Sequence, residues 1–364
     1  MLDRLWARLV GNIDGTLLTV ALLLVGLGLV TLYSATMESP SRFNAQIKNI
    51  AIAVIAMWIV AQIPPQTLMR LAVPIYLVGL ALLVGVAMFG DVAKGARRWL
   101  NIGVASIQPS ELMKIAMPLM LAWFFHRCDS TVRMREFIAS AIILALPVFL
   151  IAKQPDLGTA VLVTAAGFFV IFLAGLPWRV MIGGGVVVGA ALPFLWSSMR
   201  EYQRQRVLTL LDPSSDPLGA GYHIIQSTIA VGSGGLLGKG WLHGTQTHLE
   251  FIPERHTDFI FAVFSEEFGL LGNIVLVTLY VALVTRGMII SSSAPTAFAR
   301  LLGGAVILTI FTYAFVNMGM VSGVLPVVGV PLPLVSYGGT ALVTLFIGIG
   351  ILMSIARNKQ LVQT

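Results

Sequence analysis

Three carboxylates stand out where a polar stretch of the chain turns into a long apolar run, in the segment 251–269. Asp258, preceded by His256, opens this run, and Glu266 and Glu267 lie inside it. An ionised side chain in hydrocarbon costs several kcal/mol, so acids within a membrane span usually face a water-filled cavity and take part in chemistry or ion transport. The segment therefore predicts an integral membrane protein with its chemistry centred on Asp258.

Asp258 could act in two ways, as a general base or as a ligand of a divalent cation such as Mg²⁺ or Mn²⁺. Aspartate is also a favoured helix N-cap, and capping alone would explain the residue without any chemistry. On a straight helix that starts at Asp258, Glu266 would lie about 12 Å deeper and about 80° around, and Glu267 about 180° around. Only one glutamate could then share a cavity with Asp258, and the alternative is that both bond to neighbouring spans.

Further charged side chains stand at the ends of other apolar runs. Glu111 and Lys114 lie three residues apart and share one helix face, where they either neutralise one another or contact a substrate. Arg97 and Arg98 stand beside Trp99, a combination that suits an anionic lipid headgroup but also a plain interfacial anchor. Both pairs are candidate substrate contacts.

The remaining candidates are Asp156, Arg204 and Arg206. Asp156 lies in a tight connection, where it could bind substrate or simply cap the next helix. Arg204 and Arg206 begin the longest loop and could pair with phosphate or remain solvated. The glycine-rich stretch 232–240 fails the phosphate-loop pattern at both ends, and the histidines lack zinc-ligand spacing. No nucleotide or zinc site is predicted, and the lone Cys128 excludes an internal disulfide.

The composition indicates how these residues are held. Of the 364 residues, 57% are hydrophobic and only 11% are charged, which is far too apolar for an ordinary soluble globule. A membrane-spanning helix needs about 20 apolar residues. About ten such segments can be placed, near 15–35, 47–63, 71–90, 109–126, 137–153, 158–175, 180–198, 258–285, 297–322 and 339–356.

We therefore expect an all-α integral membrane protein, with residues 1–364 forming a single polytopic domain. Ten spans place both termini on one side, and the positive-inside rule predicts that this side is cytoplasmic, because its segments hold the whole formal charge of +7. The loop 198–257 then lies outside and is expected to fold against the bundle. The segment 323–339 is apolar but contains Pro326, Pro331 and Pro333, so it is expected to be a re-entrant or cavity-lining loop.

Several long strings occur in the chain in the order of a known family. They are GARRWL, QPSELMK, QPDLGTA, YQRQRVLTLLDPSSDPLGAGYH, GSGGLLGKGWLHGTQ, FIPERHTDFIFA and MGMVSGVLPVVGVPLPLVSYGG. From about Thr16 to Ala356 the chain resembles the SEDS family of peptidoglycan glycosyltransferases, and its rod-shape members more than its division members. One departure is Thr340, where the family is expected to have Ser, and the hydroxyl is kept.

The resemblance implies an enzyme that polymerises lipid II at the periplasmic face of the bacterial inner membrane during cell elongation. Asp258 matches the family's essential acid. The implied partners are a class B penicillin-binding protein, which is a transpeptidase, and other proteins of the elongation complex. No nucleic-acid partner is expected.

The hypothesis for the reaction is attack by an acceptor sugar hydroxyl on the anomeric carbon of a donor whose leaving group is a polyprenyl diphosphate. Asp258 would be the base, and Arg97, Arg98, Lys114, Arg204 and Arg206 are candidates to stabilise the diphosphate, with or without a divalent cation. Two alternatives are a lipid II flippase that works by alternating access and a scaffold that only anchors the transpeptidase.

Overall fold

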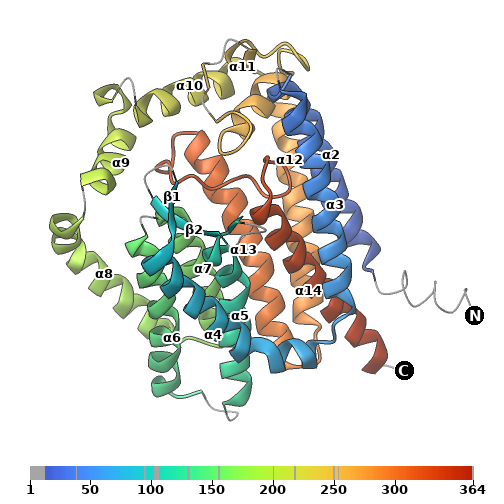
Figure 1. The fold of residues 1–364 in the computed structure, drawn as a ribbon, viewed down its shortest axis with the longest axis vertical. Helices are drawn as coiled ribbons and strands as arrows, with labels where there is room; N and C mark the ends of the chain where they lie inside the picture. Colours follow the sequence, from blue (N-terminus) through green and yellow to red (C-terminus); the bar gives the residue numbers. More distant parts are fainter. Residues whose placement is uncertain are drawn as a thin grey trace, which may run out of the picture.

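The structure, a computed structural model, describes residues 13–362 except 38, 94–95, 102–105, 129–131, 155, 200, 217–218, 249–250 and 253. In this part of the chain, ten long helices occupy the ten segments expected to span a membrane (Figure 1). They are α2 Gly15–Ala35, α3 Pro40–Gln62, α4 Pro65–Phe89, α5 Pro109–Arg127, α6 Met134–Lys153, α7 Leu157–Leu173, α8 Trp178–Ser198, α12 Ile260–Ser292, α13 Ala297–Val321 and α14 Thr340–Val362.

Most of these helices satisfy the requirements of a membrane span. Among the described residues, seven helices are long and apolar enough to cross a membrane by length and composition, namely α2, α3, α4, α6, α12, α13 and α14. The helix α7 and most of α8 are shorter apolar helices. The prediction of an all-α, multi-pass membrane protein is confirmed.

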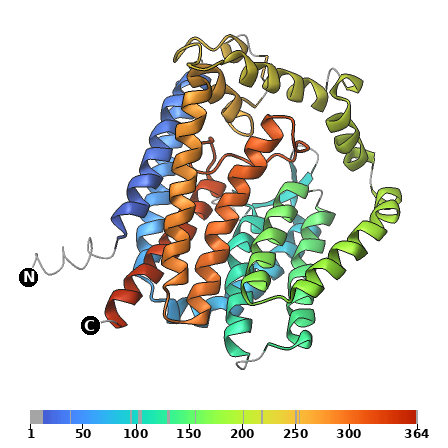
Figure 2. The ribbon, with the colours of Figure 1, turned by 180° about the vertical axis from the view of Figure 1, so that it is seen from behind.

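The long helices alternate in direction, so the molecule has two distinct ends (Figures 1 and 2). The start of α2 and the end of α14 lie at one end, which we call the termini end, together with the α12–α13 turn. The opposite end, which we call the loop end, carries residues 322–339 and the described residues between 199 and 259. Residues far apart in the sequence can therefore meet at the loop end.

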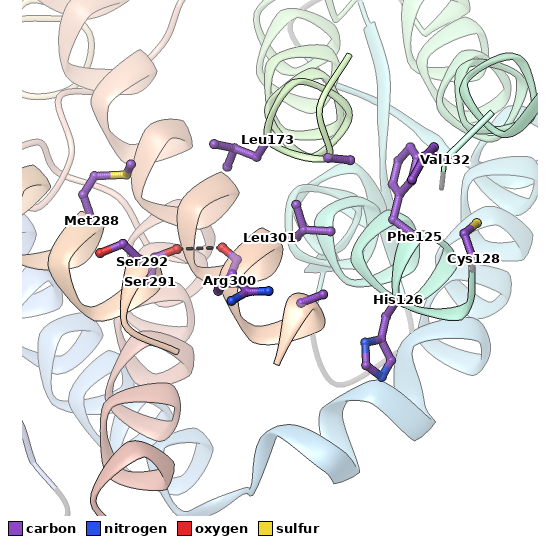
Figure 3. Close-up of a pocket in the computed structure, with 12 residues that line it drawn as sticks. Phe125, His126, Cys128, Val132, Leu173, Met288, Ser291, Ser292, Arg300 and Leu301 are labelled. Atoms are coloured by element: carbon purple, nitrogen blue, oxygen red, sulfur yellow. Dashed lines mark hydrogen bonds between the residues drawn. The ribbon is translucent and has the colours of Figure 1, made fainter. Parts of the chain in front are cut away.

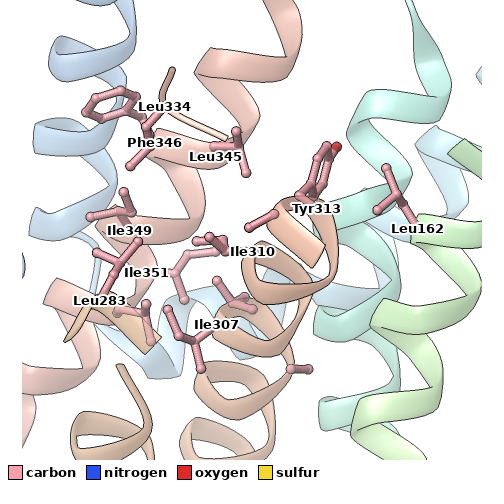
Figure 4. Packing of buried hydrophobic residues seen from close by; sticks show 14 of the residues in the cluster. Leu162, Leu283, Ile307, Ile310, Tyr313, Leu334, Leu345, Phe346, Ile349 and Ile351 are labelled. Carbon is pink, nitrogen blue, oxygen red and sulfur yellow. The ribbon is translucent and has the colours of Figure 1, made fainter. Parts of the chain in front are cut away.

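The core lies around α13. This helix packs against α5, α7, α12 and α14, and most of its residues are buried. Figure 4 shows Ile307 and Ile310 of α13 beside Leu283 of α12 and Ile349 and Ile351 of α14. In contrast, side chains along most of α8 are exposed, because this helix stands at the edge of the bundle.

The loop end holds the other regular elements. An antiparallel sheet of strands β1, β2 and β3 lies between α4 and α5 and was not expected from the sequence. The segment between α8 and α12 contains short helices that arch over one side of the bundle (Figure 1). The bounds are β1 Asp91–Ala93, β2 Ala96–Asn101, β3 Ser106–Ile107, α9 Glu201–Leu211, the 3₁₀ helix Pro213–Ser215, α10 Ala220–Ser233 and α11 Thr245–His248.

The helix α12 is sharply bent at Gly269, which has φ 63° and ψ −160°. This is a conformation that glycine adopts far more readily than other residues. The Ser265 hydroxyl lies 3.0 Å from the Asn273 side-chain oxygen, although eight residues of a straight helix would separate the two by about 12 Å. The expectation of one straight span over 258–285 is therefore wrong, because the helix bends just after Glu266 and Glu267.

Candidate functional site

Asp258 lies in the turn 254–259 that leads into α12, at the loop end. The helix begins at Ile260 with Phe259 at the N-cap position, so Asp258 stands one residue before the cap. Its side chain is partly exposed, and a Cβ added at Gly329 would lie 3.3 Å from its Oδ2 atom. The carboxylate is therefore neither sealed among aliphatic side chains nor directed to the termini end.

Asn317 of α13 holds the backbone around this carboxylate. Its completely buried side-chain amide donates to the carbonyl oxygen of Asp258 at 2.8 Å and to that of Val330 at 2.7 Å. A single amide thus ties the turn before α12 to the loop after α13. This bond is to the main chain of Asp258 and not to its carboxylate, so Asn317 fixes the position of the turn that carries the side chain.

The segment 323–339, which we call the proline loop, contacts the same turn at further points. The Ser336 hydroxyl donates to the carbonyl of Thr257 at 2.7 Å, and the Tyr337 amide donates to that of His256 at 2.9 Å. The rings of His256 and Tyr337 also meet edge to face, with centroids 5.8 Å apart. The proline loop therefore packs against the turn of Asp258, and its role as a re-entrant or cavity-lining segment stays a prediction.

The proline loop contains an unusual backbone conformation at Leu334, whose φ is 65°. Left-handed conformations cost an L-residue about 1–2 kcal/mol, so the surrounding contacts must hold this one in place. The buried Tyr280 hydroxyl donates to the carbonyl of the preceding Pro333 at 2.6 Å. Strained backbone of this kind concentrates at functional sites.

Asp156 and Arg98 lie on the other flank of the proline loop. Asp156 caps α7 by accepting from the Thr159 amide at 3.2 Å, and its second oxygen accepts from the Gln108 side chain at 3.1 Å. Arg98 is 3.8 Å from that same oxygen. Next to this group, a Cβ added at Gly158 would lie 2.6 Å from the Val328 carbonyl, so α7 and the proline loop are in backbone contact.

Val328 and Gly329 are adjacent in the chain, so one short stretch of the proline loop lies between Asp258 and the Asp156 group. The structure thus brings Asp258, His256, Asp156 and Arg98 to the two flanks of a single loop. At these flanks, the two carboxylates and the imidazole can exchange a proton with a substrate hydroxyl, and the guanidinium can bind an anionic group of the substrate.

Glu111 and Lys114 form a buried ion pair, with Lys114 Nζ 2.5 Å from Glu111 Oε1. The Lys114 ammonium also donates to the hydroxyl of Tyr313 on α13. The pairing along one helix face is the structural alternative that the spacing predicted. Tyr313 could not be predicted, because it lies 199 residues further along the chain.

The side chains of Glu266 and Glu267 bond to other segments of the chain and not to each other. Glu266 is completely buried, and its Oε1 atom lies 2.7 Å from the ammonium of Lys239 in the loop 198–257, which we call the large loop. Glu267 accepts a hydrogen bond from Ser34 of α2. Both glutamates therefore bond to neighbouring segments, the alternative considered for them, and a contact of Glu266 with substrate stays a prediction.

The arginines of the large loop are placed only in part. Arg204 donates from Nε to the Trp196 carbonyl at 2.8 Å and from Nη2 to the Ser197 carbonyl at 2.5 Å, so it satisfies carbonyls at the end of α8. Its contact with a diphosphate stays a prediction. Arg97 lies in β2 and Arg206 in α9, but their side chains lie outside the described part of the structure.

Asn317 and Tyr313 are the site residues that sequence reasoning missed. Both are polar side chains inside an apolar span, where an unpaired polar group is costly, and that signal could have marked them. The partners they bind could not have been inferred, since they come from other helices and loops.

A metal site made by the protein alone is not found among the described residues, where no group of three His, Cys, Asp or Glu side chains could hold an ion. A divalent cation at Asp258 would therefore take most of its ligands from diphosphate oxygens and water. The binding of Mg²⁺ or Mn²⁺ by Asp258 stays a prediction.

The bundle and its loop-end site define a multi-pass membrane protein with a partly exposed carboxylate beside the proline loop. The FtsW/RodA/SpoVE family model, described as cell cycle protein, matches residues 15–361. The chain belongs to this family.

Two relatives illustrate the similarity in sequence. Peptidoglycan glycosyltransferase MrdB of Escherichia coli strain K12 is 50% identical over 351 residues, which cover 96% of this chain and 95% of that protein. The probable peptidoglycan glycosyltransferase FtsW of Geobacter metallireducens is 36% identical over 361 residues, covering 95% of each.

Solved structures share the fold. A chain from a study of the structural coordination of polymerization and crosslinking by a peptidoglycan synthase complex has a TM-score of 0.83 and 33% identity, covering 95% of this chain and 98% of that one. The rod shape determining protein RodA of Thermus thermophilus has a TM-score of 0.73 and 29% identity, covering 95% and 97%.

Proposed function

We propose that the protein is a peptidoglycan glycosyltransferase that polymerises lipid II into glycan strands during cell elongation. The observation that carries the proposal is the Asp258 carboxylate, partly exposed against Gly329 while Asn317 holds its backbone. The names of the relatives and the family membership support the same activity.

In the proposed reaction, the 4-hydroxyl of the acceptor sugar attacks the anomeric carbon of the donor, and the bond from that carbon to the diphosphate oxygen breaks. Asp258 accepts the hydroxyl proton as the new bond forms. A positioned base of this kind contributes about a hundred- to ten-thousandfold to the rate. One displacement converts an α-linked donor into a β-linked product.

The leaving diphosphate needs positive charge but no proton. Arg98 lies on the flank of the proline loop that holds Asp156, with its Nε atom 3.8 Å from Asp156 Oδ2. We propose that it contacts the diphosphate, and that Asp156 orients it. Lys114 is already engaged by Glu111 and Tyr313 inside the bundle, so we assign it a positioning role.

The lipid part of the substrate requires an apolar surface. A groove of about 640 Å³ lies between α6, α7 and α8, with walls that include Phe137, Val148, Phe168 and Val188. Grooves of this size and character suit the apolar part of a ligand. Its lining residues begin in the first turns of α6 and α8, toward the termini end, so we propose that it receives the part of the polyprenyl chain that is distant from the diphosphate.

The proposed setting is the bacterial inner membrane, with both termini cytoplasmic and the loop end in the periplasm. The basic excess of the segments assigned to the termini end supports this orientation. The proposed partner is a class B penicillin-binding protein that crosslinks the new strands, which the similarity to a chain of a peptidoglycan synthase complex supports.

The test is to incubate the purified full-length chain, with and without that partner, with lipid II in detergent, where no membrane separates two sides. Glycan polymer on a gel is the expected result. If no polymer forms with the partner present while the reconstituted protein moves lipid II across vesicles, the transporter alternative replaces the proposal.

A further inference from the structure

A second cavity lies at the termini end, far along the bundle from Asp258. It measures about 630 Å³, is open to the surface on one side, and is lined by the last turns of α5, α7 and α12 and the first turn of α13 (Figure 3). We call it the termini-end pocket. Its walls are mostly apolar, and its polar side chains include His126, Ser292 and Arg300.

Figure 3 shows Arg300 on the wall formed by α12 and α13 and His126 on the facing wall from α5. The side chain of Arg300 is exposed, and its carbonyl accepts from the Ser291 hydroxyl at 2.6 Å. Arg300 lies in the first turn of α13, where the helix dipole disfavours a cation. The helix dipole therefore does not explain why an arginine occupies this position, whereas a bound anion would explain it.

An adjoining pocket of about 600 Å³ shares Cys128 with the first and extends its basic character. It adds the guanidinium groups of Arg127, Arg133 and Arg135 and a single described acid, Glu136. That acid already accepts from the Arg135 side chain at 2.6 Å and the Arg133 amide at 2.8 Å. Positive charge thus exceeds negative charge among the described residues around both pockets.

The location fits the headgroup layer of a membrane. Trp123 lines the adjoining pocket, and the Arg127 guanidinium stacks over its ring at 4.9 Å. Tryptophan and arginine at the end of a spanning helix are typical of the membrane interface. The apolar walls below Arg300 are formed by the spanning helices themselves, so they continue toward the hydrocarbon.

From this arrangement we propose that the termini-end pocket binds an anionic phospholipid of the adjacent leaflet. Arg300 and His126 contact its phosphate, and the apolar walls receive the first carbons of its acyl chains. A free phosphate would leave these walls unused, and a zwitterionic lipid would place its own cation against Arg300. Basic pockets between membrane helices commonly select lipids in this way.

The experiment titrates the purified full-length protein with phosphatidylglycerol or phosphatidylcholine and counts bound lipids by native mass spectrometry. Arg300→Gln is expected to weaken phosphatidylglycerol binding by about fivefold, which corresponds to about 1 kcal/mol. Arg70→Gln is the matched control, because Arg70 is an exposed arginine near the start of α4, which also lies at the termini end, but it lines neither pocket. The affinity of the Arg70→Gln variant for phosphatidylglycerol should equal that of the wild type.

A second variant, Ser292→Trp, fills the pocket from its rim and should also reduce binding without removing a charge. Excess inorganic phosphate should not displace the lipid. Equal binding of the two lipids, equal losses in the Arg300 and Arg70 variants, or displacement by inorganic phosphate alone would each overturn the proposal.

Discussion

Glu266→Gln is predicted to loosen the part of the large loop that wraps the bend of α12. Glu266 Oε1 accepts from the Lys239 ammonium at 2.7 Å, the Thr245 hydroxyl at 3.0 Å and the Gln246 amide at 3.0 Å. Glutamine keeps one acceptor oxygen for these donors but removes the charge that strengthens all three bonds.

The magnitude follows from the difference between charged and neutral hydrogen bonds. A bond to a charged group contributes roughly 1.5–3 kcal/mol, and a neutral one contributes about 1 kcal/mol. The Lys239 side chain is 27% exposed, so solvent can partly replace its partner and the lower end of the range applies. We expect a loss of about 1–2 kcal/mol in the local opening free energy.

Hydrogen exchange measures this opening directly. The Lys239 amide donates to the Glu266 carbonyl at 2.9 Å, and the Gly240 amide donates to the Glu267 carbonyl at 3.1 Å. These amides should exchange about 5- to 30-fold faster in Glu266→Gln, while Glu201→Gln, an exposed acid of the same loop, should leave them unchanged.

Lys239→Met should produce a similar acceleration, and the double variant should show less than the sum of the two effects. Unchanged exchange at Lys239 and Gly240 in Glu266→Gln would refute the reasoning, since the carboxylate would then not hold the loop.

Two further predictions concern the stability of the bundle. Asp14→Asn should lower the unfolding free energy by about 1 kcal/mol, because Asp14 Oδ2 lies 2.5 Å from Arg286 Nη2. Burial is the largest single influence and raises the pKa of Asp14, but the hydrogen bonds from Arg286 and the Leu17 amide together with the Arg286 charge outweigh it, so the pKa lies below its ordinary value of 3.8. This stabilisation is therefore present above pH 3.8 and is lost as the pH falls through the lower folded-state pKa, and thermal unfolding at several pH values measures the loss. Gly28→Ala should reduce both thermal stability and polymerisation, because its Cβ would lie 2.7 Å from Val335 Cα. Gly26→Ala should reduce neither, because no atom lies within 4 Å of the Cβ it would add. Equal effects of the two variants would contradict the close packing of α2 on the proline loop.

The membrane spans could be predicted from the sequence because hydropathy alone determines where a helix can cross a bilayer. The proline loop was also predicted, since its prolines exclude a straight helix. The bend at Gly269 was not, because a glycine within an apolar run is common in membrane helices and does not by itself indicate a reversal.

The site was predicted only in part for a similar reason. Asp258 was singled out by its charge at the start of an apolar run. Its neighbours Gly329 and Asn317 come from other parts of the chain, and an isolated sequence carries no signal for which backbone approaches which carboxylate. The small sheet that holds Arg98 was likewise missed, because its strands are short and their pairing depends on tertiary contacts.

The central claim is that the Asp258 carboxylate takes the proton from the attacking sugar hydroxyl. The most direct measurement is the rate of lipid II polymerisation by purified Asp258→Asn together with its partner. Asparagine has nearly the same size as aspartate, and the bond from Asn317 to the backbone carbonyl is kept, so this variant should fold normally and retain its thermal unfolding midpoint.

Asp212→Asn is the matched control, because asparagine can keep the capping bond that Asp212 makes to the Ser214 amide. We expect Asp258→Asn to slow polymerisation by about a hundred- to ten-thousandfold, while Asp212→Asn stays near the wild-type rate. Near-normal polymerisation by a folded Asp258→Asn protein would contradict it.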